Sequence, residues 1–119
     1  MPFTPRIKVN LVPVTGQSEV VDLTAEFNAD NSINCIRFLN PNDEAVFWRN
    51  GADASVKATM SDVMVLPKSV EYFGLQQGGT FIAVYAPAPG DAVRIIAGEW
   101  KSDPTRPLPM VSEPKGGDQ

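Results

Sequence analysis

The stretch from Ser69 to Trp100 decides the fold. It reads SVEYFGL (69–75), QQGG (76–79), TFIAVYA (80–86), PAPG (87–90) and DAVRIIAGEW (91–100). Three runs rich in Val, Ile, Tyr, Phe and Thr suit a pleated, half-buried surface, and the short Gly- and Pro-rich segments between them favour chain reversals. The stretch therefore predicts three antiparallel strands in a meander, with the run at 80–86 in the middle of a sheet that is covered on both sides.

More strands are predicted on the N-terminal side of this stretch. Ile7, Val9 and Leu11 alternate with polar residues, which indicates a half-exposed strand over 6–12 that ends at Pro13 and turns these apolar side chains inward. Strands are also predicted at 18–23, 33–40, 45–49 and 60–66, and the strands at 33–40 and 45–49 are expected to form a hairpin. A helical turn is predicted at 25–27, and either a helix or a strand at 54–58. About seven to nine short strands predict an all-β fold, an antiparallel β-sandwich resembling a jelly roll.

The chain is predicted to contain one domain between two proline-bearing arms. Residues 1–5 form an extended N-terminal arm, residues 6–100 the β-sandwich domain, and residues 101–119 a C-terminal arm that holds four of the eleven prolines. Apolar anchors in the C-terminal arm are few, so it is expected to stay extended unless a neighbouring subunit orders it. These anchors are Leu108, Met110 and Val111.

Composition excludes several classes of protein. The 119 residues are 43% hydrophobic and carry a net charge of -4, which is typical of one globular domain and argues against a nucleic-acid partner. No apolar run approaches the ~20 residues of a membrane span, and Met1 to Arg6 lack the apolar core of a signal peptide. We therefore expect synthesis in the cytoplasm and no membrane partner.

Catalytic and metal-binding patterns are absent from the sequence. The chain has no histidine, which removes Ser-His-Asp and Cys-His catalysis, and its one cysteine, Cys35, lies in an apolar run and is expected to be buried. The acidic groups at Asp43–Glu44 and at Asp22 and Glu26 fit solvated turns, and Gly74–Gly79 fits a hairpin turn rather than a phosphate loop. We expect no enzyme activity, no cofactor and no metal site.

Aromatic residues are the remaining candidates for a binding surface. Phe47 and Trp48 are adjacent, so in a strand they point to opposite faces and one of them leaves the core. Core packing, a subunit interface and a platform for sugars are the three interpretations of these residues and of Tyr72, Tyr85 and Trp100.

Several segments resemble small virion structural proteins of tailed bacteriophages and prophages. The resemblance covers about Ile33 to Trp100. It is carried by RFLN (37–40), VFWRNG (46–51), LP (66–67), VEYFGL (70–75), TFIAVYA (80–86) and GE (98–99).

The resemblance implies a β-sandwich that decorates or cements a capsid. Such a protein would lie on the capsid exterior, bind the major capsid protein, bridge neighbouring subunits and self-associate into a small homo-oligomer. The expected interface residues are Phe47, Trp48, Trp100, Leu108, Met110 and Val111. Two alternatives stay open: a head-to-tail connector or tail component of the virion, and a carbohydrate-binding β-sandwich module.

Overall fold

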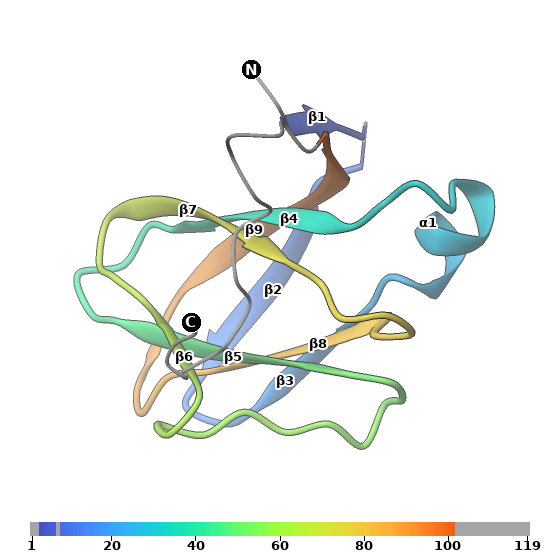
Figure 1. Ribbon diagram of the computed structural model, residues 1–119. Coiled ribbons are helices and arrows are strands. Elements are labelled where there is room, and N and C mark those ends of the chain that lie inside the picture. Colours follow the sequence, from blue (N-terminus) through green and yellow to red (C-terminus); the bar gives the residue numbers. More distant parts are fainter. Residues whose placement is uncertain (1–2, 7, 102–119) are drawn as a thin grey trace.

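A computed structural model describes residues 3–6 and 8–101 of the chain. Two antiparallel sheets pack face to face as a β-sandwich, with one short helix at the side (Figure 1). The elements are β1 (Phe3–Pro5), β2 (Asn10–Thr15), β3 (Glu19–Asp22), α1 (Thr24–Ala29), β4 (Cys35–Asn40), β5 (Val46–Gly51), β6 (Val63–Val65), β7 (Ser69–Gly74), β8 (Phe81–Tyr85) and β9 (Pro89–Trp100). The predicted all-β sandwich is confirmed.

Consecutive strands mostly lie in opposite sheets. The five-stranded sheet has the order β1-β9-β4-β7, with β2 also paired to β9, and the four-stranded sheet has the order β3-β8-β5-β6. β8 therefore lies inside the four-stranded sheet, as predicted, but the predicted meander of β7, β8 and β9 is wrong. The predicted hairpin of β4 and β5 is also wrong, because each of these short turns carries the chain across to the other sheet.

An aromatic cluster fills the space between the sheets. Trp48 lies 5.1 Å from Phe73 and 6.4 Å from Phe38, measured between ring centroids, and both Trp48 and Phe38 are completely buried. Ile36, Ile82 and other aliphatic side chains complete the core. The sandwich is therefore closed by side chains from both sheets, as packed sheets require.

β2 lies in the opposite register to the one predicted. Asn10, Val12 and Val14 face the core, whereas Leu11 is 62% exposed. Asn10 is accommodated because its amide donates to the Glu26 carboxylate at 3.1 Å and to a backbone carbonyl of β9 at 3.3 Å. The strand also continues through Pro13, where the pairing with β9 shifts register and no ladder hydrogen bond is needed.

The segment predicted as an extended N-terminal arm contributes the strand β1 to the sandwich. β1 pairs with the end of β9, and the Phe3 side chain is buried. A Cβ atom at Gly98 would lie 2.7 Å from the Phe3 ring and 2.4 Å from the Thr4 carbonyl oxygen. Gly98 therefore allows the close approach of β1 to β9.

The loops are fixed by two asparagines of the segments that carry the resemblance. Asn40 is completely buried, and its amide donates to the Glu44 and Leu66 carbonyls at 2.9 and 3.2 Å. Asn50 donates in the same way to the Gly79 and Phe81 carbonyls. Both asparagines thus tie loops together, which gives these motif positions a structural role.

Two ambiguous segments are resolved. The predicted helical turn at 25–27 is the centre of α1, and the segment 54–58, expected as helix or strand, forms turns and irregular structure. The predicted C-terminal arm, apart from Lys101, lies outside the described residues.

Candidate interaction surface

The outer face of the five-stranded sheet presents a row of apolar side chains around an arginine. Arg94 on β9 lies opposite Leu11 on one side and Leu39 on the other, and Leu39 lies opposite Val70 at the sheet edge. The chain neighbours of Leu11, Leu39 and Arg94 are buried, so alternation places these three side chains outward, and Val70 lies on the same face because it is paired with Leu39. Leu11 is 62% exposed and Val70 is 40% exposed. Water therefore reaches apolar surface along the whole row.

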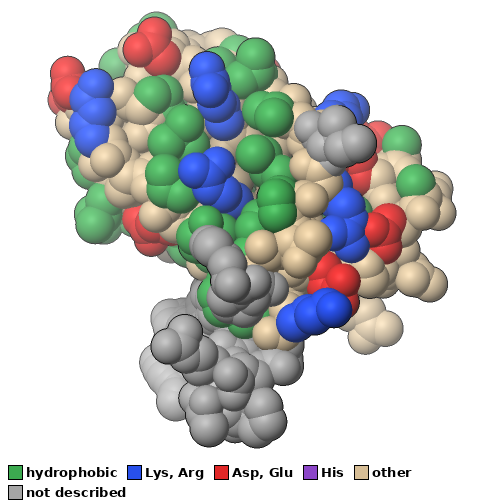
Figure 2. All heavy atoms as spheres, turned by 90° about the horizontal axis from the view of Figure 1, so that it is seen from above, with side chains coloured by type: hydrophobic (Ala, Val, Ile, Leu, Met, Phe, Trp, Pro, Cys, Tyr) green, Lys and Arg blue, Asp and Glu red, His purple; other side chains and the backbone are tan. Residues whose placement is uncertain are grey.

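A second row lies beside the first. Arg37 on β4 has Ile96 and Tyr72 as its cross-strand partners, and all three are partly buried. In Figure 2 this side of the molecule shows Lys and Arg side chains standing among hydrophobic ones. We call the seven residues of the two rows the outer face: Leu11, Arg37, Leu39, Val70, Tyr72, Arg94 and Ile96.

The charge of the outer face is positive. Its two charged residues are Arg37 and Arg94. Neither arginine forms an ion pair with another described residue. A shallow hollow of about 490 Å³ beside Leu11 and Arg94 has Asp91 in its lining. The net effect is an apolar face with two guanidinium groups that have no ion-pair partner among the described residues, a composition that favours contact with an acidic protein surface.

Aromatic rings extend the outer face towards the end of β9. Tyr72 lies 5.1 Å from Phe3 and 5.9 Å from Trp100, measured between ring centroids. The Tyr72 and Trp100 rings are inclined by 60° to each other. They therefore form a packed ridge rather than a flat platform.

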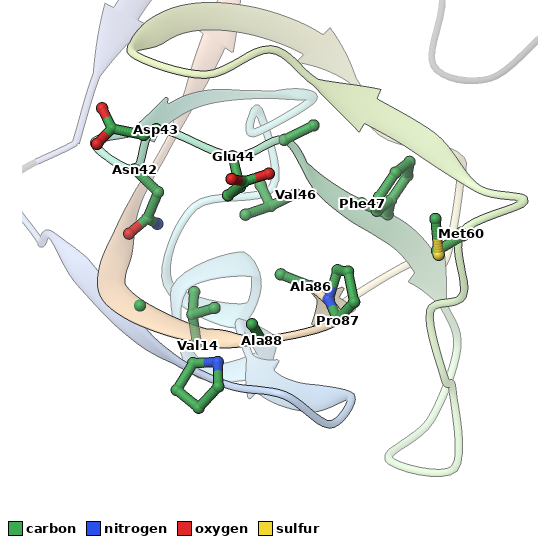
Figure 3. Close-up of a pocket in the computed structure, with 13 residues that line it drawn as sticks. Val14, Asn42, Asp43, Glu44, Val46, Phe47, Met60, Ala86, Pro87 and Ala88 are labelled. Carbon is green, nitrogen blue, oxygen red and sulfur yellow. The ribbon is translucent and has the colours of Figure 1, made fainter.

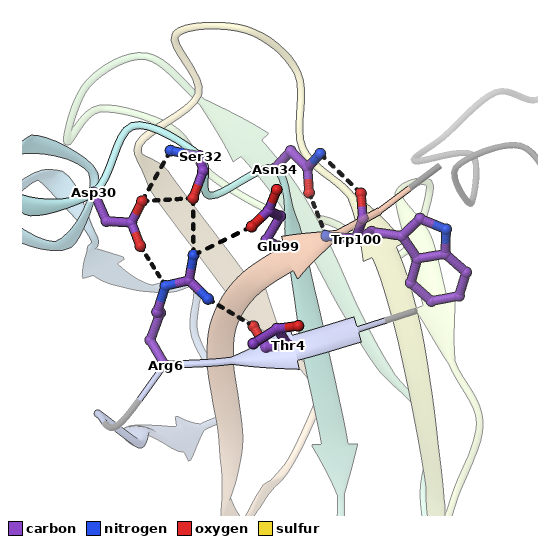
Figure 4. A network of polar contacts seen from close by, with 7 residues as sticks. All are labelled: Thr4, Arg6, Asp30, Ser32, Asn34, Glu99 and Trp100. Carbon is purple, nitrogen blue, oxygen red and sulfur yellow. Dashed lines mark hydrogen bonds and ion pairs between the residues drawn. The ribbon is translucent and has the colours of Figure 1, made fainter. Parts of the chain in front are cut away.

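Polar contacts fix the position of this ridge (Figure 4). The Trp100 backbone N–H donates to the side-chain oxygen of Asn34 at 2.8 Å, and the side-chain NH2 group of Asn34 donates to the Trp100 carbonyl at 3.3 Å. Arg6 binds the Asp30 carboxylate and also donates to Ser32 at 2.8 Å. Hydrogen bonds from Arg6 and Ser32 lower the pKa of Asp30 to about 2. The end of β9 at Trp100 is therefore held by hydrogen bonds to Asn34.

The expected interface residues are not brought together. Trp48 is completely buried, so its expected place at an interface is corrected: alternation in β5 puts Trp48 in the core and leaves its neighbour Phe47 half-exposed. Phe47 lies in the four-stranded sheet and Trp100 in the five-stranded sheet. The other three, Leu108, Met110 and Val111, lie outside the described residues.

The outer face itself was not among the expected interface residues. The sequence pattern predicts Leu11 in the core, because its alternation with polar residues is typical of an inward face. The signal for the correct assignment is the run from Val93 to Ala97, where three small or aliphatic residues on one face alternate with Arg94 and Ile96 on the other.

Residues that carry reactive chemistry are dispersed. Among residues 3–6 and 8–101, no three His, Cys, Asp or Glu side chains gather in a way that could hold a metal ion. Cys35 is buried as predicted, and burial raises the pKa of its thiol to about 12. Asp43 pairs with Lys68 at 3.5 Å, and hydrogen bonds from Thr24 lower the pKa of Asp22. Within the described part, no helix is long and apolar enough to cross a membrane.

Comparison with known proteins gives no match: no protein-family model matches the chain, and neither curated proteins nor solved structures give a match. The function is therefore argued from the outer face and from the resemblance carried by its motifs.

Proposed function

We propose that this chain is a structural protein of a tailed-bacteriophage particle, acting as a decoration or cement protein. The observation that carries the proposal is the outer face, where Leu11 and Leu39 flank Arg94 across the paired strands and exposed Val70 continues the row beside Leu39. The resemblance over Ile33 to Trp100 supports the same assignment. In this role the protein lies on the capsid exterior, binds the major capsid protein, and associates with copies of itself.

The mechanism is adhesion by a preorganised surface. The outer face is built on paired strands, so its side chains lose little freedom when a partner covers them. Arginine and aromatic residues supply much of the energy of protein interfaces, and Arg37, Arg94 and Tyr72 are available here. On a capsid the same weak contact repeats at every lattice position, and a bridging protein gains avidity from binding two subunits at once.

Binding rather than catalysis is favoured by the chemistry of the chain. No histidine is present to act as a general base, and the one thiol is buried with a raised pKa. The outer face instead offers contact area and positive charge.

The copy number in the particle tests this proposal. Virions purified from the phage or prophage that encodes the chain are separated on a gradient, and the chain is quantified against the major capsid protein by mass spectrometry. A decoration protein is present in a fixed proportion to the capsid protein. A few copies per particle would instead indicate a connector or tail component, and absence from purified virions would contradict a virion role.

A carbohydrate-binding module is the less favoured alternative. Trp48 is buried, and the inclined rings of Tyr72 and Trp100 give no flat surface on which a sugar ring could stack. Binding of the purified protein on a glycan array, lost in Trp100→Ala, would support the carbohydrate reading against the virion role.

A further inference from the structure

The two arginines of the outer face lie on one diagonal of the sheet. Arg37 is opposite Ile96, and Leu39, two residues further along β4, is opposite Arg94. Side chains in this diagonal relation lie about 7–8 Å apart. Neither guanidinium has an ion-pair partner among the described residues. The outer face therefore suits a partner that brings two negative charges at a matching separation.

The hollow beside Arg94 continues this diagonal on the side away from Arg37. Its volume is about 490 Å³, and Asp91 and Arg94 share its lining with four apolar residues: Leu11, Leu39, Pro41 and Ala92. An apolar side chain would be dehydrated here on several sides. A third acidic side chain would instead lie near Asp91, a residue of like charge. The hollow therefore suits an apolar group of the same partner.

An extended polypeptide matches this arrangement. Side chains two residues apart in an extended chain point in the same direction and lie about 6.6–6.8 Å apart. Three successive same-side positions can thus reach Arg37, Arg94 and the hollow in turn. The matching segment has the pattern acidic-x-acidic-x-apolar, where x is any residue whose side chain points away from the sheet.

This chain does not supply such a segment. It has fourteen Asp and Glu residues, yet no two of them stand two positions apart in the 119 residues. Asp43 and Glu44 are adjacent, and adjacent side chains of an extended chain point to opposite sides. The occupant with this pattern is therefore a segment of a different protein.

The cavity where β9 begins does not suit the same segment (Figure 3). This cavity of about 500 Å³ has an apolar floor formed by the buried side chains of Val14, Val46 and Ala86. Figure 3 shows the Glu44 side chain above Val46, and Glu44 forms no ion pair with another described residue. Its negative charge disfavours an acidic ligand, so charge selects the outer face.

A protein segment fits the outer face better than a nucleic acid does. Five of the seven side chains of the outer face are uncharged and largely apolar, and the whole chain carries a net charge of -4. Nucleic-acid sites are usually strongly basic, because they neutralise many phosphates. A phosphate backbone also has no apolar side chain to fill the hollow.

We propose that the outer face binds an extended segment of a partner protein with the pattern acidic-x-acidic-x-apolar. Its two carboxylates lie against Arg37 and Arg94, and its apolar side chain enters the hollow. Pairs of guanidinium and carboxylate groups are directional, so the spacing of the acidic residues matters as well as their charge. The proposed contact rests on the proposed function, because both place the partner on the outer face.

Peptides that differ only in the order of their residues test the spacing. The isotopically labelled full-length protein is titrated with Glu-Ser-Glu-Ser-Leu or with its isomer Glu-Glu-Ser-Ser-Leu, both blocked at their termini, and the amide chemical shifts are followed. We expect the first peptide to bind at least about tenfold more tightly than the isomer and to shift amides of β4 and β9. A single-stranded DNA hexamer is the third ligand and should bind more weakly than the first peptide.

Reversal of both charges tests the two arginines. We expect Arg37→Glu/Arg94→Glu to lose the acidic peptide and to bind Lys-Ser-Lys-Ser-Leu instead. Lys57→Glu is the matched control, because Lys57 is exposed in a loop, and it should bind the acidic peptide like the wild type. The amide spectrum of each free variant shows that its fold is retained.

Equal binding of the two acidic peptides by the wild type would overturn the proposed contact. Shifts confined to other elements, or tighter binding of the DNA, would do the same. If the wild type covers capsids but does not distinguish the peptides, the contact is wrong and the virion role stands. If the peptides are distinguished but the chain is absent from purified virions, the contact is supported and the virion role is contradicted.

Discussion

At the scale of single residues, two buried asparagines take part in defining this fold beside the apolar core. Asn40 and Asn10 lie among core residues, and each satisfies its amide with carbonyl or carboxylate oxygens of other segments. Alternation in the sequence could not reveal this, because a buried asparagine looks like a surface residue. This ambiguity explains why the predicted register of β2 is the opposite of the observed one. It also explains why the sequence pattern predicts Leu11 in the core although Leu11 is exposed.

Replacing Asn40 with alanine tests the loop-fixing role. Asn40→Ala leaves the Glu44 and Leu66 carbonyls without their donor, so we expect the free energy of unfolding to fall by about 2–3 kcal/mol in urea denaturation. Asn28→Ala is the control, since Asn28 is exposed in α1 and should change stability by less than about 0.5 kcal/mol. Equal effects of the two changes would show that Asn40 has no special role.

Asp30 gives the molecule a predictable response to acid. Its pKa is lowered from 3.8 to about 2 in the folded chain, so the Arg6–Asp30 pair stabilises the fold above the ordinary pKa and this contribution is lost as the pH falls towards 2. The stability advantage of the wild type over Asp30→Asn should therefore be full at about pH 5 and shrink between about pH 4 and 2. Unfolding curves in this range measure it, and an advantage that is constant with pH would contradict the ion pair.

At the scale of elements, strand positions were predictable and strand partners were not. β-branched and aromatic runs mark β4, β5, β7, β8 and β9 near their observed bounds. Gln76–Gly79 and Pro41–Glu44, however, join strands of opposite sheets, and turn residues are the same whether a chain pairs back or crosses over. The alternation of Phe47 and Trp48 likewise predicted that one side chain would leave the core, and only the packing of Phe38 and Phe73 shows which one.

The attachment of β1 depends on the space left at Gly98. We expect Gly98→Ala to detach β1 from β9, because the added Cβ atom would collide with the Thr4 carbonyl oxygen, which is backbone and cannot turn aside. Hydrogen exchange should then accelerate at the Arg6 amide, which donates to the Ala97 carbonyl in the native fold. Amides of β8 serve as the internal control and should keep their protection. Unchanged exchange at Arg6 would contradict this packing.

At the scale of the whole molecule, the proposed role requires the sandwich to present contact surfaces to other subunits. The outer face presents apolar and cationic groups on one sheet, and the cavity beside Glu44 opens at one end of the sandwich. A protein that bridges a lattice needs one contact for its support and another for its neighbours. The sequence indicated adhesion through the lack of catalytic residues and the C-terminal segment, but the outer face required the sheet register.

Shortening the chain after Lys101 tests the proposed contact role of the C-terminal segment. The core is formed by residues of the two sheets, so we expect the denaturation midpoint of the shortened chain, measured at low concentration, to match that of the full chain. Sedimentation should show that self-association is lost. A large fall in the midpoint would mean that the removed segment stabilises its own domain, contrary to a role in contacts between molecules.

Occupancy on the capsid tests the central claim, adhesion through the outer face, most directly. Capsids that lack the protein are mixed with wild type, Arg37→Glu, Arg94→Glu or the control Lys57→Glu, which changes an exposed loop residue by the same charge. Bound protein is then quantified after sedimentation. The account predicts full occupancy for wild type and Lys57→Glu and strongly reduced occupancy for both arginine variants, with the fold retained by circular dichroism. Full occupancy of the arginine variants, or no binding by the wild type, would contradict it.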